Sequence, residues 1–427
     1  MAAGCNETAP PVARAFRNAL CIELYQVIVR IGWIFKTETI IMPAVLDAVV
    51  DSGVLRGLLP VLNRGGQSLP PLFFAGPLGR RPVKKWTLVR TTLAMAACFA
   101  VLAAAWTPLA GRPALLAGVF LLLYASFSAC NGLTQLVAAA LQGKLIAPAH
   151  RGRALVVSAV VGSVLAIAAA ILLLRPWLGE PDGFPKIFAA TAGFFALAAF
   201  VPALLDEPAD PAQPRPTRPE GAWPWAGLGR GVADWRRTLA ADRSLVRLSL
   251  VAACFSAVIM LFPHYQAFAR DRLGSPIGSL LTWVIVQNVA TGVVSLVAGP
   301  VADRRGTRIV LTWLVALSSF TPLLVTALSL LPHPVAARWF WVVYAPLGMN
   351  PVSLRIFTNY ALELAPRMAD HPRYVSIVGA ALAAPFVLSP LVGLAVDLFG
   401  FRHVFVIGAA VIACGAVLAA GLPEPRR

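Results

Sequence analysis

Five charged residues lie deep inside long apolar stretches of this sequence, and they are its most informative feature. Four are basic and one is acidic: Arg30, Lys36, Arg64, Arg355 and Glu38. An arginine at the centre of a bilayer costs at least ~2.5–3.5 kcal/mol, so it normally faces protein or water. Because a guanidinium holds a carboxylate or phosphate through two parallel hydrogen bonds, the three arginines predict a site for an anion. The alternative for each arginine is a buried ion pair with Glu38 or Glu363.

Helical spacing shows which of these groups share a face, since residues three or four apart on a helix lie one above the other. The first such face carries Glu23, Gln26, Arg30, Trp33 and Thr37, with Glu38 beside it. Lys36 lies off this face. We therefore rank it below Arg30 as a residue that lines a cavity, unless Thr37–Thr39 and Pro43 distort the helix. We therefore predict that Arg30, Thr37 and Glu38 line a polar site.

Three further segments carry polar faces with the same spacing. They hold Tyr124, Ser128, Asn131, Gln135 and Gln142; Tyr344, Gly348, Pro351, Arg355 and Asn359; and Pro60, Arg64 and Gln67. From these faces we add Arg64, Gln67, Tyr124, Asn131, Gln135, Tyr344, Arg355 and Asn359 to the predicted site. For Asn131 and Gln135 the alternative is a hydrogen bond between helices, worth about 0.6 kcal/mol.

The elements that must position these residues are membrane helices. The chain is 58% hydrophobic and only 13% charged, with a mean hydropathy of +0.75, whereas about a quarter of residues are charged in soluble domains. About 20 apolar residues cross ~30 Å of hydrocarbon as a helix. We predict an all-α membrane protein with twelve spans, because the segments lack the alternation of barrel strands. The predicted spans are 19–48, 53–77, 86–107, 113–142, 154–175, 187–205, 245–268, 277–302, 307–331, 338–364, 374–398 and 402–422.

The formal charge of +17 raises the question of a nucleic-acid partner. The Lys and Arg residues, however, concentrate in alternate loops, on the side that holds both termini. By the positive-inside rule this side is cytoplasmic. We therefore predict a multi-pass protein of the cell (inner or plasma) membrane with both termini in the cytoplasm and no nucleic-acid partner.

Two stretches at equivalent places mark a duplication: Gly76-Pro-Leu-Gly-Arg-Arg-Pro-Val-Lys-Lys85 and Gly299-Pro-Val-Ala-Asp-Arg-Arg-Gly-Thr-Arg308. Between the halves, a proline-rich stretch from Asp206 to Glu220 predicts an extended linker. Val232–Arg243 can then form a short basic amphipathic helix on the inner membrane surface. The predicted units are an N-terminal half (1–205), a cytoplasmic linker (206–243) and a C-terminal half (244–427).

With twelve spans in two sixes, a long central loop and the signature Gly299-x-x-x-Asp-Arg-x-Gly-x-Arg308, the chain resembles the major facilitator superfamily over essentially its full length. The resemblance implies two six-helix bundles that expose a central cavity alternately to the two sides. It also implies a conformational gate at the two loops, comprising Gly76, Arg80, Arg81, Gly299, Asp303, Arg304, Gly306 and Arg308. The first loop departs from the family pattern, because Arg80 stands where an acidic residue is expected and Val83 where a glycine is expected.

We predict a secondary active transporter, a symporter or antiporter, that moves a small solute by alternating access. The net positive set of deep charges favours an organic anion, and Glu38 is the candidate for coupling to protons or another ion. The alternative is a proton-coupled exporter of hydrophobic or cationic drug-like compounds; a sensor or scaffold without transport is less favoured. Clustered nucleophiles, metal ligands and a Walker-type phosphate loop are absent from the sequence, so we expect no enzyme activity, no metal and no cofactor. The expected partners are the bilayer and the solute, and the expected state is a monomer.

Overall fold

The structure is a computed structural model that describes residues 12–79, 81–146, 160–180, 182–210, 235–367 and 370–424. Helices make up nearly all of these ranges, and no strand occurs within them. Arg80 and most of the linker, residues 211–234, lie outside the described residues, as does the side chain of Asp303.

The N-terminal half consists of six helical passages. They are formed by α1 (Val12–Phe35) with α2 (Ile41–Asp47), α3 (Gly53–Gly79), α4 (Lys85–Leu109), α5 (Pro113–Leu145), residues 160–169 with η1 (Ala170–Leu174) and α7 (Arg175–Leu178), and α8 (Gly183–Phe200) with η2 (Val201–Leu204). The predicted continuous span 19–48 is wrong, because α1 stops at Phe35 and the chain turns before α2 begins. Pro43 lacks the N–H that a continuous helix would need and crowds the preceding turn, which favours this break.

The C-terminal half repeats the arrangement with more interruptions. Its helices are α10 (Arg243–Leu273), α11 (Ser279–Arg305), α12 (Thr307–Leu328), α13 (His333–Trp339) with η3 (Phe340–Val343), α14 (Tyr344–Leu347) and α15 (Asn350–Leu364), α16 (His371–Ala383) with η5 (Ala384–Leu388) and α17 (Ser389–Phe399), and α18 (Phe401–Ala420). The predicted spans 338–364 and 374–398 are therefore each divided into shorter pieces. Pro346, Pro351 and Pro385 lie near these interruptions, as expected for residues that cannot donate within a helix.

Ten helical segments of the described chain are long and apolar enough to cross a membrane. The two other predicted spans, 53–77 and 338–364, correspond to α3 and to the pieces α13 to α15. The helix α3 carries Arg56 and Arg64, and the second region is broken into short pieces. The arrangement is consistent with twelve spans, but that number stays a prediction.

The short helix that was expected after the linker covers residues 235–241. We predicted that this helix lies on the inner membrane surface, which stays a prediction. Trp235 and Leu239 lie on one side of it, are partly buried and pack against the main hydrophobic core of the protein. The apolar face of this helix is therefore partly covered by protein.

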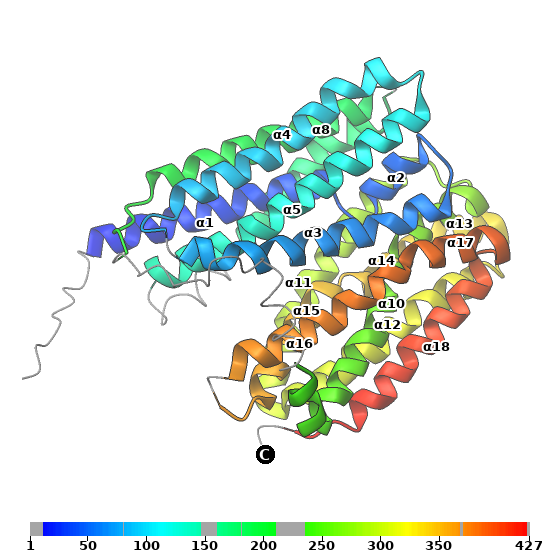
Figure 1. Ribbon diagram of the computed structural model, residues 1–427. Coiled ribbons are helices and arrows are strands. Elements are labelled where there is room, and N and C mark those ends of the chain that lie inside the picture. The colour runs from blue at the N-terminus through cyan, green and yellow to red at the C-terminus, as the bar shows by residue number, and fades with distance from the viewer. Residues whose placement is uncertain are drawn as a thin grey trace, which may run out of the picture.

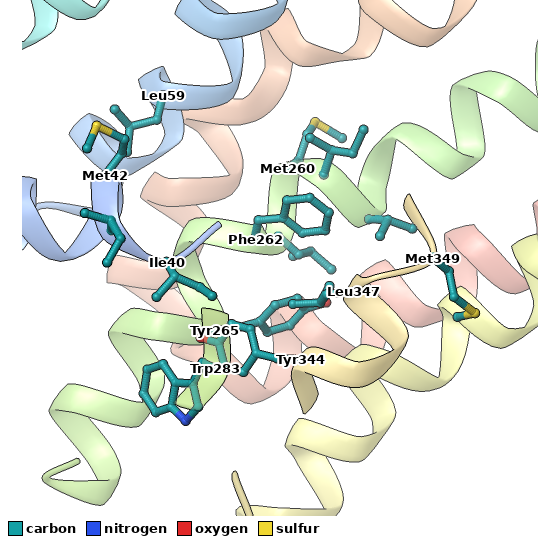
Figure 2. Packing of buried hydrophobic residues seen from close by; sticks show 14 of the residues in the cluster. Ile40, Met42, Leu59, Met260, Phe262, Tyr265, Trp283, Tyr344, Leu347 and Met349 are labelled. Carbon is teal, nitrogen blue, oxygen red and sulfur yellow. The ribbon is translucent and has the colours of Figure 1, made fainter. Parts of the chain in front are cut away.

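The two halves form separate bundles that meet near α2, α13 and α17 and diverge toward the other helix ends (Figure 1). At the meeting end α3 packs against α17, and α2 packs against α10. The core is continuous across this contact, because Ile40, Met42 and Leu59 of the first half belong to the same buried cluster as Phe262 and Tyr344 of the second (Figure 2). The molecule is thus closed between its halves at one end.

Candidate functional site

The break between α1 and α2 brings Lys36 and Glu38 together. Lys36 Nζ lies 2.8 Å from Glu38 Oε1. The lysine side chain is 0% exposed, whereas that of Glu38 is 27% exposed. Residues two apart on a regular helix point in different directions, so only the turn at residues 36–40 permits this pair. The helix is therefore distorted at Lys36, as we had allowed, but the lysine is fully buried, and its low rank as a cavity residue stays a prediction.

Side chains of α3 and α5 extend the polar site from Glu38. Asn63 Nδ2 donates to Glu38 Oε1 and, at 3.2 Å, to the hydroxyl of Tyr124. Gln67 Nε2 in turn donates to Asn63 Oδ1 at 2.7 Å. Glu38, Gln67 and Tyr124 were predicted site residues, but Asn63 was missed. Its position four residues before Gln67 places it on the same helix face and was the signal that could have found it.

Aromatic rings surround the ammonium group of Lys36. Its Nζ atom lies 3.4 Å from the ring centroid of Trp33 and 4.5 Å from that of Phe127. A cation over an aromatic face is attracted by the ring quadrupole, and the attraction grows when water is excluded. The rings and Glu38 together explain how a fully buried lysine can keep its charge.

Arg30 and Arg355 approach each other from opposite halves of the molecule. Their charges are close enough to repel each other, although one lies on α1 and the other on α15. The stem of Arg30 runs beside Gly162, where an added Cβ would lie 2.9 Å from Arg30 Cδ. Neither arginine has a hydrogen bond or ion pair to any residue that the structure describes. Two neighbouring guanidinium groups without an acidic partner can hold one anion.

Arg64 lies near the Lys36–Glu38 pair, and its charge acts on both members. No carboxylate within the described ranges lies in ion-pair contact with Arg64. The other proposed buried partner, Glu363, accepts a hydrogen bond from Thr307 Oγ1 at 2.8 Å. The alternative interpretation, in which Glu38 or Glu363 pairs directly with a deep arginine, therefore has no support from the observed contacts.

The remaining predicted site residues differ in their surroundings. Thr37 Oγ1 donates to the carbonyl of Ile34, and Tyr344 is fully buried with its ring stacked on Trp283 at 4.9 Å. Asn131 is buried, and its Nδ2 atom has no partner among the described residues. Gln135 and Asn359 are exposed. Of this group, Tyr344 belongs to the packed core.

One side-chain hydrogen bond joins the two halves close to Lys36 and Glu38. Thr39, in the turn between α1 and α2, donates from Oγ1 to Oε1 of Gln287 on α11 at 2.6 Å. Movement of one half relative to the other would break this bond. The turn that holds Lys36 and Glu38 is therefore coupled mechanically to the contact between the halves.

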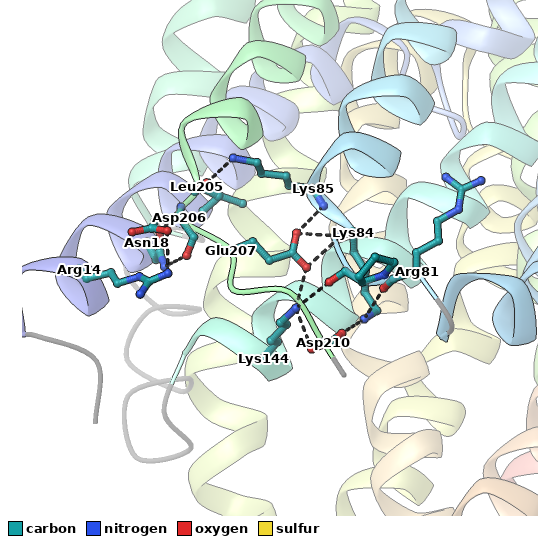
Figure 3. Close-up of polar contacts among 11 residues, drawn as sticks. Arg14, Asn18, Arg81, Lys84, Lys85, Lys144, Leu205, Asp206, Glu207 and Asp210 are labelled. Atoms are coloured by element: carbon teal, nitrogen blue, oxygen red, sulfur yellow. Dashed lines mark hydrogen bonds and ion pairs between the residues drawn. The ribbon is translucent and has the colours of Figure 1, made fainter. Parts of the chain in front are cut away.

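The loop after α3 contacts the start of the linker instead of an acidic residue of its own. The Glu207 carboxylate accepts hydrogen bonds from the backbone N–H groups of Lys84 (2.8 Å) and Lys85 (2.7 Å), and it pairs with Lys144 Nζ at 2.9 Å (Figure 3). Asp210 also pairs with Lys84 and Lys144. Hydrogen bonds from these two lysines hold the pKa of Asp210 below its usual range. Glu207 thus supplies a carboxylate at the start of α4.

A glutamate also lies beside the loop after α11, although its carboxylate oxygens have no hydrogen-bond partner among the described residues. Gly306 has a φ of +97°, which favours glycine, and it lies directly against the carboxylate of Glu424. Arg308 donates to the carbonyl of Leu422 at 3.2 Å. Among the predicted gate residues, Arg304 is exposed, as is Arg81, which donates to the hydroxyl of Thr87. Gly76 and Gly299 lie in the last turns of α3 and α11. Glu207 and Glu424, which follow the last helix of their respective halves, therefore each lie beside one of the two loops.

A cluster of charges at the meeting end of the halves was not predicted. This inter-half charge cluster consists of Asp47, Asp51, Arg56, Arg270 and Asp397. Arg56 is 3% exposed and lies 2.9 Å from oxygens of both Asp47 and Asp51. Partial burial would raise the pKa of Asp51, but the guanidinium groups of Arg270 and Arg56 hold it below the usual range.

Backbone contacts reinforce this cluster. The N–H of Gly53 donates to Asp397 Oδ2 at 2.9 Å, and Gly57 lies against the backbone of Ser389. The segment Gly393–Gly400 contributes Asp397 to this cluster, and its partner Gly53 belongs to the other half, so the contact leaves no local pattern in the sequence. At the opposite end, the ion pairs within the described ranges join residues of one half with each other or with the linker. Polar contacts between the halves thus concentrate at one end.

Comparison with curated proteins finds no match to the chain. Solved structures resemble it over nearly their full length. A POT family transporter in complex with 5-aminolevulinic acid has 12% sequence identity and a TM-score of 0.71, with 96% of this chain and 97% of that one covered. A D-xylose-proton symporter has 15% identity and a TM-score of 0.66 (95% and 98% covered), and the nucleoside transporter NupG has 11% identity and a TM-score of 0.62 (95% and 98% covered). At these identities the likeness shows the fold alone. The chain also matches the family model of the Major Facilitator Superfamily over residues 68–355. Because this match covers most of the chain, the protein belongs to the Major Facilitator Superfamily of membrane transporters.

Proposed function

We propose that this protein is a secondary active transporter that carries a small organic anion by alternating access. The observation that carries the proposal is the approach of Arg30 and Arg355 from opposite halves without a carboxylate between them in the described chain. Arg30 is partly buried and Arg355 is exposed, and no carboxylate of the described chain compensates either charge. Arginines within membrane helices normally face protein or a water-filled space, which supports a place for an anion beside these two. An anion held by both halves would also link binding to their relative movement.

The closed end of the molecule supports an alternating-access cycle. The inter-half charge cluster joins α2 and α3 to α10 and α17, while the ion pairs at the other end stay within one half and the linker. With both termini in the cytoplasm, the closed end is external and this conformation faces inward. A reporter fused after Pro219 should then read as cytoplasmic, and one placed in Gly179–Gly183 as external.

Glu38 is the proposed coupling group. Its carboxylate is partly exposed and contacts Lys36 and Asn63 directly, and Arg64 acts on it from a greater distance. Protonation of Glu38 would weaken its bonds to Lys36 and Asn63, which lie next to the Thr39–Gln287 contact between the halves. Proton uptake could in this way favour one conformation over the other.

The alternative, export of a hydrophobic or cationic drug-like compound, requires Glu38 to attract the positive charge. The direct pairing of Glu38 with Lys36 weighs against this role, because the ammonium already neutralises the carboxylate. The two functions separate in proteoliposomes that contain the purified protein and are given panels of organic anions and organic cations. Saturable uptake or exchange of anions supports our proposal, and transport of cations alone would refute it.

A further inference from the structure

We infer, on the basis of the proposed anion transport, that the transported anion also carries a hydroxyl or N–H group, which donates a hydrogen bond to Oε2 of Glu38. The inference comes from the contacts around the Glu38 carboxylate, which use one of its oxygens and leave the other open. It narrows the substrate class from organic anions in general to those that carry a hydrogen-bond donor.

The two oxygens of the Glu38 carboxylate have different surroundings. Oε1 accepts hydrogen bonds from Lys36 Nζ at 2.8 Å and from Asn63 Nδ2. Oε2 has no hydrogen bond or ion pair within the described ranges. It is also not one of the buried polar atoms that lack a partner, and the Glu38 side chain is 27% exposed. Oε2 is therefore the accessible oxygen, and it keeps its capacity to accept hydrogen bonds from a solute.

The groups that hold Oε1 are fixed by burial and by their other contacts. Lys36 is 0% exposed, and Asn63 is 2% exposed. Asn63 Nδ2 also donates to the hydroxyl of Tyr124, and Asn63 Oδ1 accepts from Gln67 Nε2 at 2.7 Å. If the Asn63 amide turned over, its oxygen would face the carboxylate and its nitrogen would face another N–H group, so these bonds would be lost. The carboxylate is therefore held with Oε2 as its open position.

The chemistry of this open position selects for a donor. An ionised carboxylate can only accept hydrogen bonds, so a solute group that binds Oε2 must donate one. A carbonyl oxygen at the same place would set two acceptors against each other and leave both without a hydrogen bond. The solute group needs no positive charge, because Lys36 already neutralises Glu38. A hydroxyl or N–H group of an organic anion meets these conditions.

The test compares acids that have the same charge and carbon skeleton but differ at one oxygen. The pairs are lactate with pyruvate, 3-hydroxybutyrate with 3-oxobutyrate, and 4-hydroxypentanoate with 4-oxopentanoate, which place this oxygen at three distances from the carboxylate. Binding to the purified full-length protein in detergent is measured from the concentration dependence of thermal stabilisation. We expect at least one hydroxy acid to bind about tenfold or more tightly than its oxo acid, because a hydroxyl donates to Oε2 and a carbonyl cannot.

Glu38→Gln changes the chemistry of the open position. Lys36 and Asn63 are donors, so the glutamine oxygen should face them and the NH₂ group should take the place of Oε2. This group donates to a hydroxyl and to a carbonyl alike, so the preference for the hydroxy acid should vanish or reverse while both acids still bind. A purely structural effect would weaken both acids equally and keep the preference. If this variant is not recovered in folded form, the double variant Lys36→Met with Glu38→Gln replaces it, because it leaves no unpaired charge.

The matched control is Glu180→Gln, which changes a glutamate with a 41% exposed side chain and should keep the wild-type preference. Equal or tighter binding of the oxo acids by the wild-type protein, or of panel anions without a donor, would overturn this inference alone. A preference for hydroxy acids that Glu38→Gln leaves unchanged would also overturn it. A lack of binding by every anion, including those of the panel, would instead refute the proposed transport of anions.

Discussion

The Nζ atom of Lys36 lies 2.8 Å from Oε1 of Glu38, two residues further along the chain. The contact exists because α1 ends at Phe35 and the turn before α2 points both side chains into the bundle. Lys36 is fully buried against Trp33 and Phe127, so the pair is a structural unit as well as a candidate for ion coupling.

Removing one member of this pair should destabilise the protein. Lys36→Met leaves the Glu38 carboxylate without its ammonium partner, and loss of one partner of a buried pair costs about 3–5 kcal/mol. We expect a lower melting temperature in detergent for this variant. The double variant Lys36→Met with Glu38→Gln should recover much of the loss, because no unpaired charge remains. Additive losses in the double variant would show that the two side chains do not interact.

Glu38→Gln alone should separate coupling from binding. The amide cannot release a proton, so uphill transport driven by a pH gradient should disappear. Because Lys36 loses its carboxylate partner, this variant should also be less stable, but the folded protein should continue to exchange solute across the membrane. Both activities are measured in the same proteoliposomes. Glu38 is not the coupling carboxylate if exchange is lost together with uphill transport, or if both survive.

Arg355→Lys should weaken transport by about tenfold even though the charge is kept, because the ammonium lacks the planar two-point geometry of guanidinium. The measurement is the concentration dependence of anion exchange at matched protein levels. The control is Arg90→Lys, which changes an exposed arginine on α4. Arg355→Gln should be more severe. Equal activity of the Lys and Gln variants would argue against direct binding by this residue.

Gly57→Ala should disturb the closed end of the molecule. An added Cβ would lie 2.4 Å from the backbone oxygen of Ser389, and backbone atoms cannot move aside without separating α3 from α17. In a background without native cysteines, Ser389→Cys should then react faster with a water-soluble maleimide in detergent. Gly65→Ala on the same helix is the control, because nothing lies within 4 Å of its added Cβ. Equal labelling in both variants would mean that the contact does not limit opening.

Acidification should release Asp210 from Lys84 and Lys144. Because its folded-state pKa is depressed, its contribution to stability is complete above the unfolded value of about 3.9 and is lost as the pH falls through the lower folded value. We expect Asp210→Asn to lower the melting temperature slightly at pH 7. The difference from the wild-type protein should vanish below the folded-state pKa. A difference independent of pH would exclude the charge as its cause.

Much of the architecture could be predicted from the sequence, because apolar composition and helical periodicity are properties of each segment by itself. Composition predicted the all-α membrane fold, and the two related loops led to the family, which the match over residues 68–355 confirms. The polar faces of α1, α3 and α5 also brought Glu38, Gln67 and Tyr124 into one predicted site, and the structure places these three in one network.

Tertiary structure decided which charged groups meet. The pairing of Lys36 with Glu38 depends on a helix break, and helical periodicity assumes that the helix continues. The approach of Arg30 to Arg355 and the inter-half charge cluster depend on how two bundles pack, which joins residues more than 200 positions apart. Periodicity along one helix does not indicate which residues of the other half pack against it. These contacts could therefore be identified only from the tertiary structure.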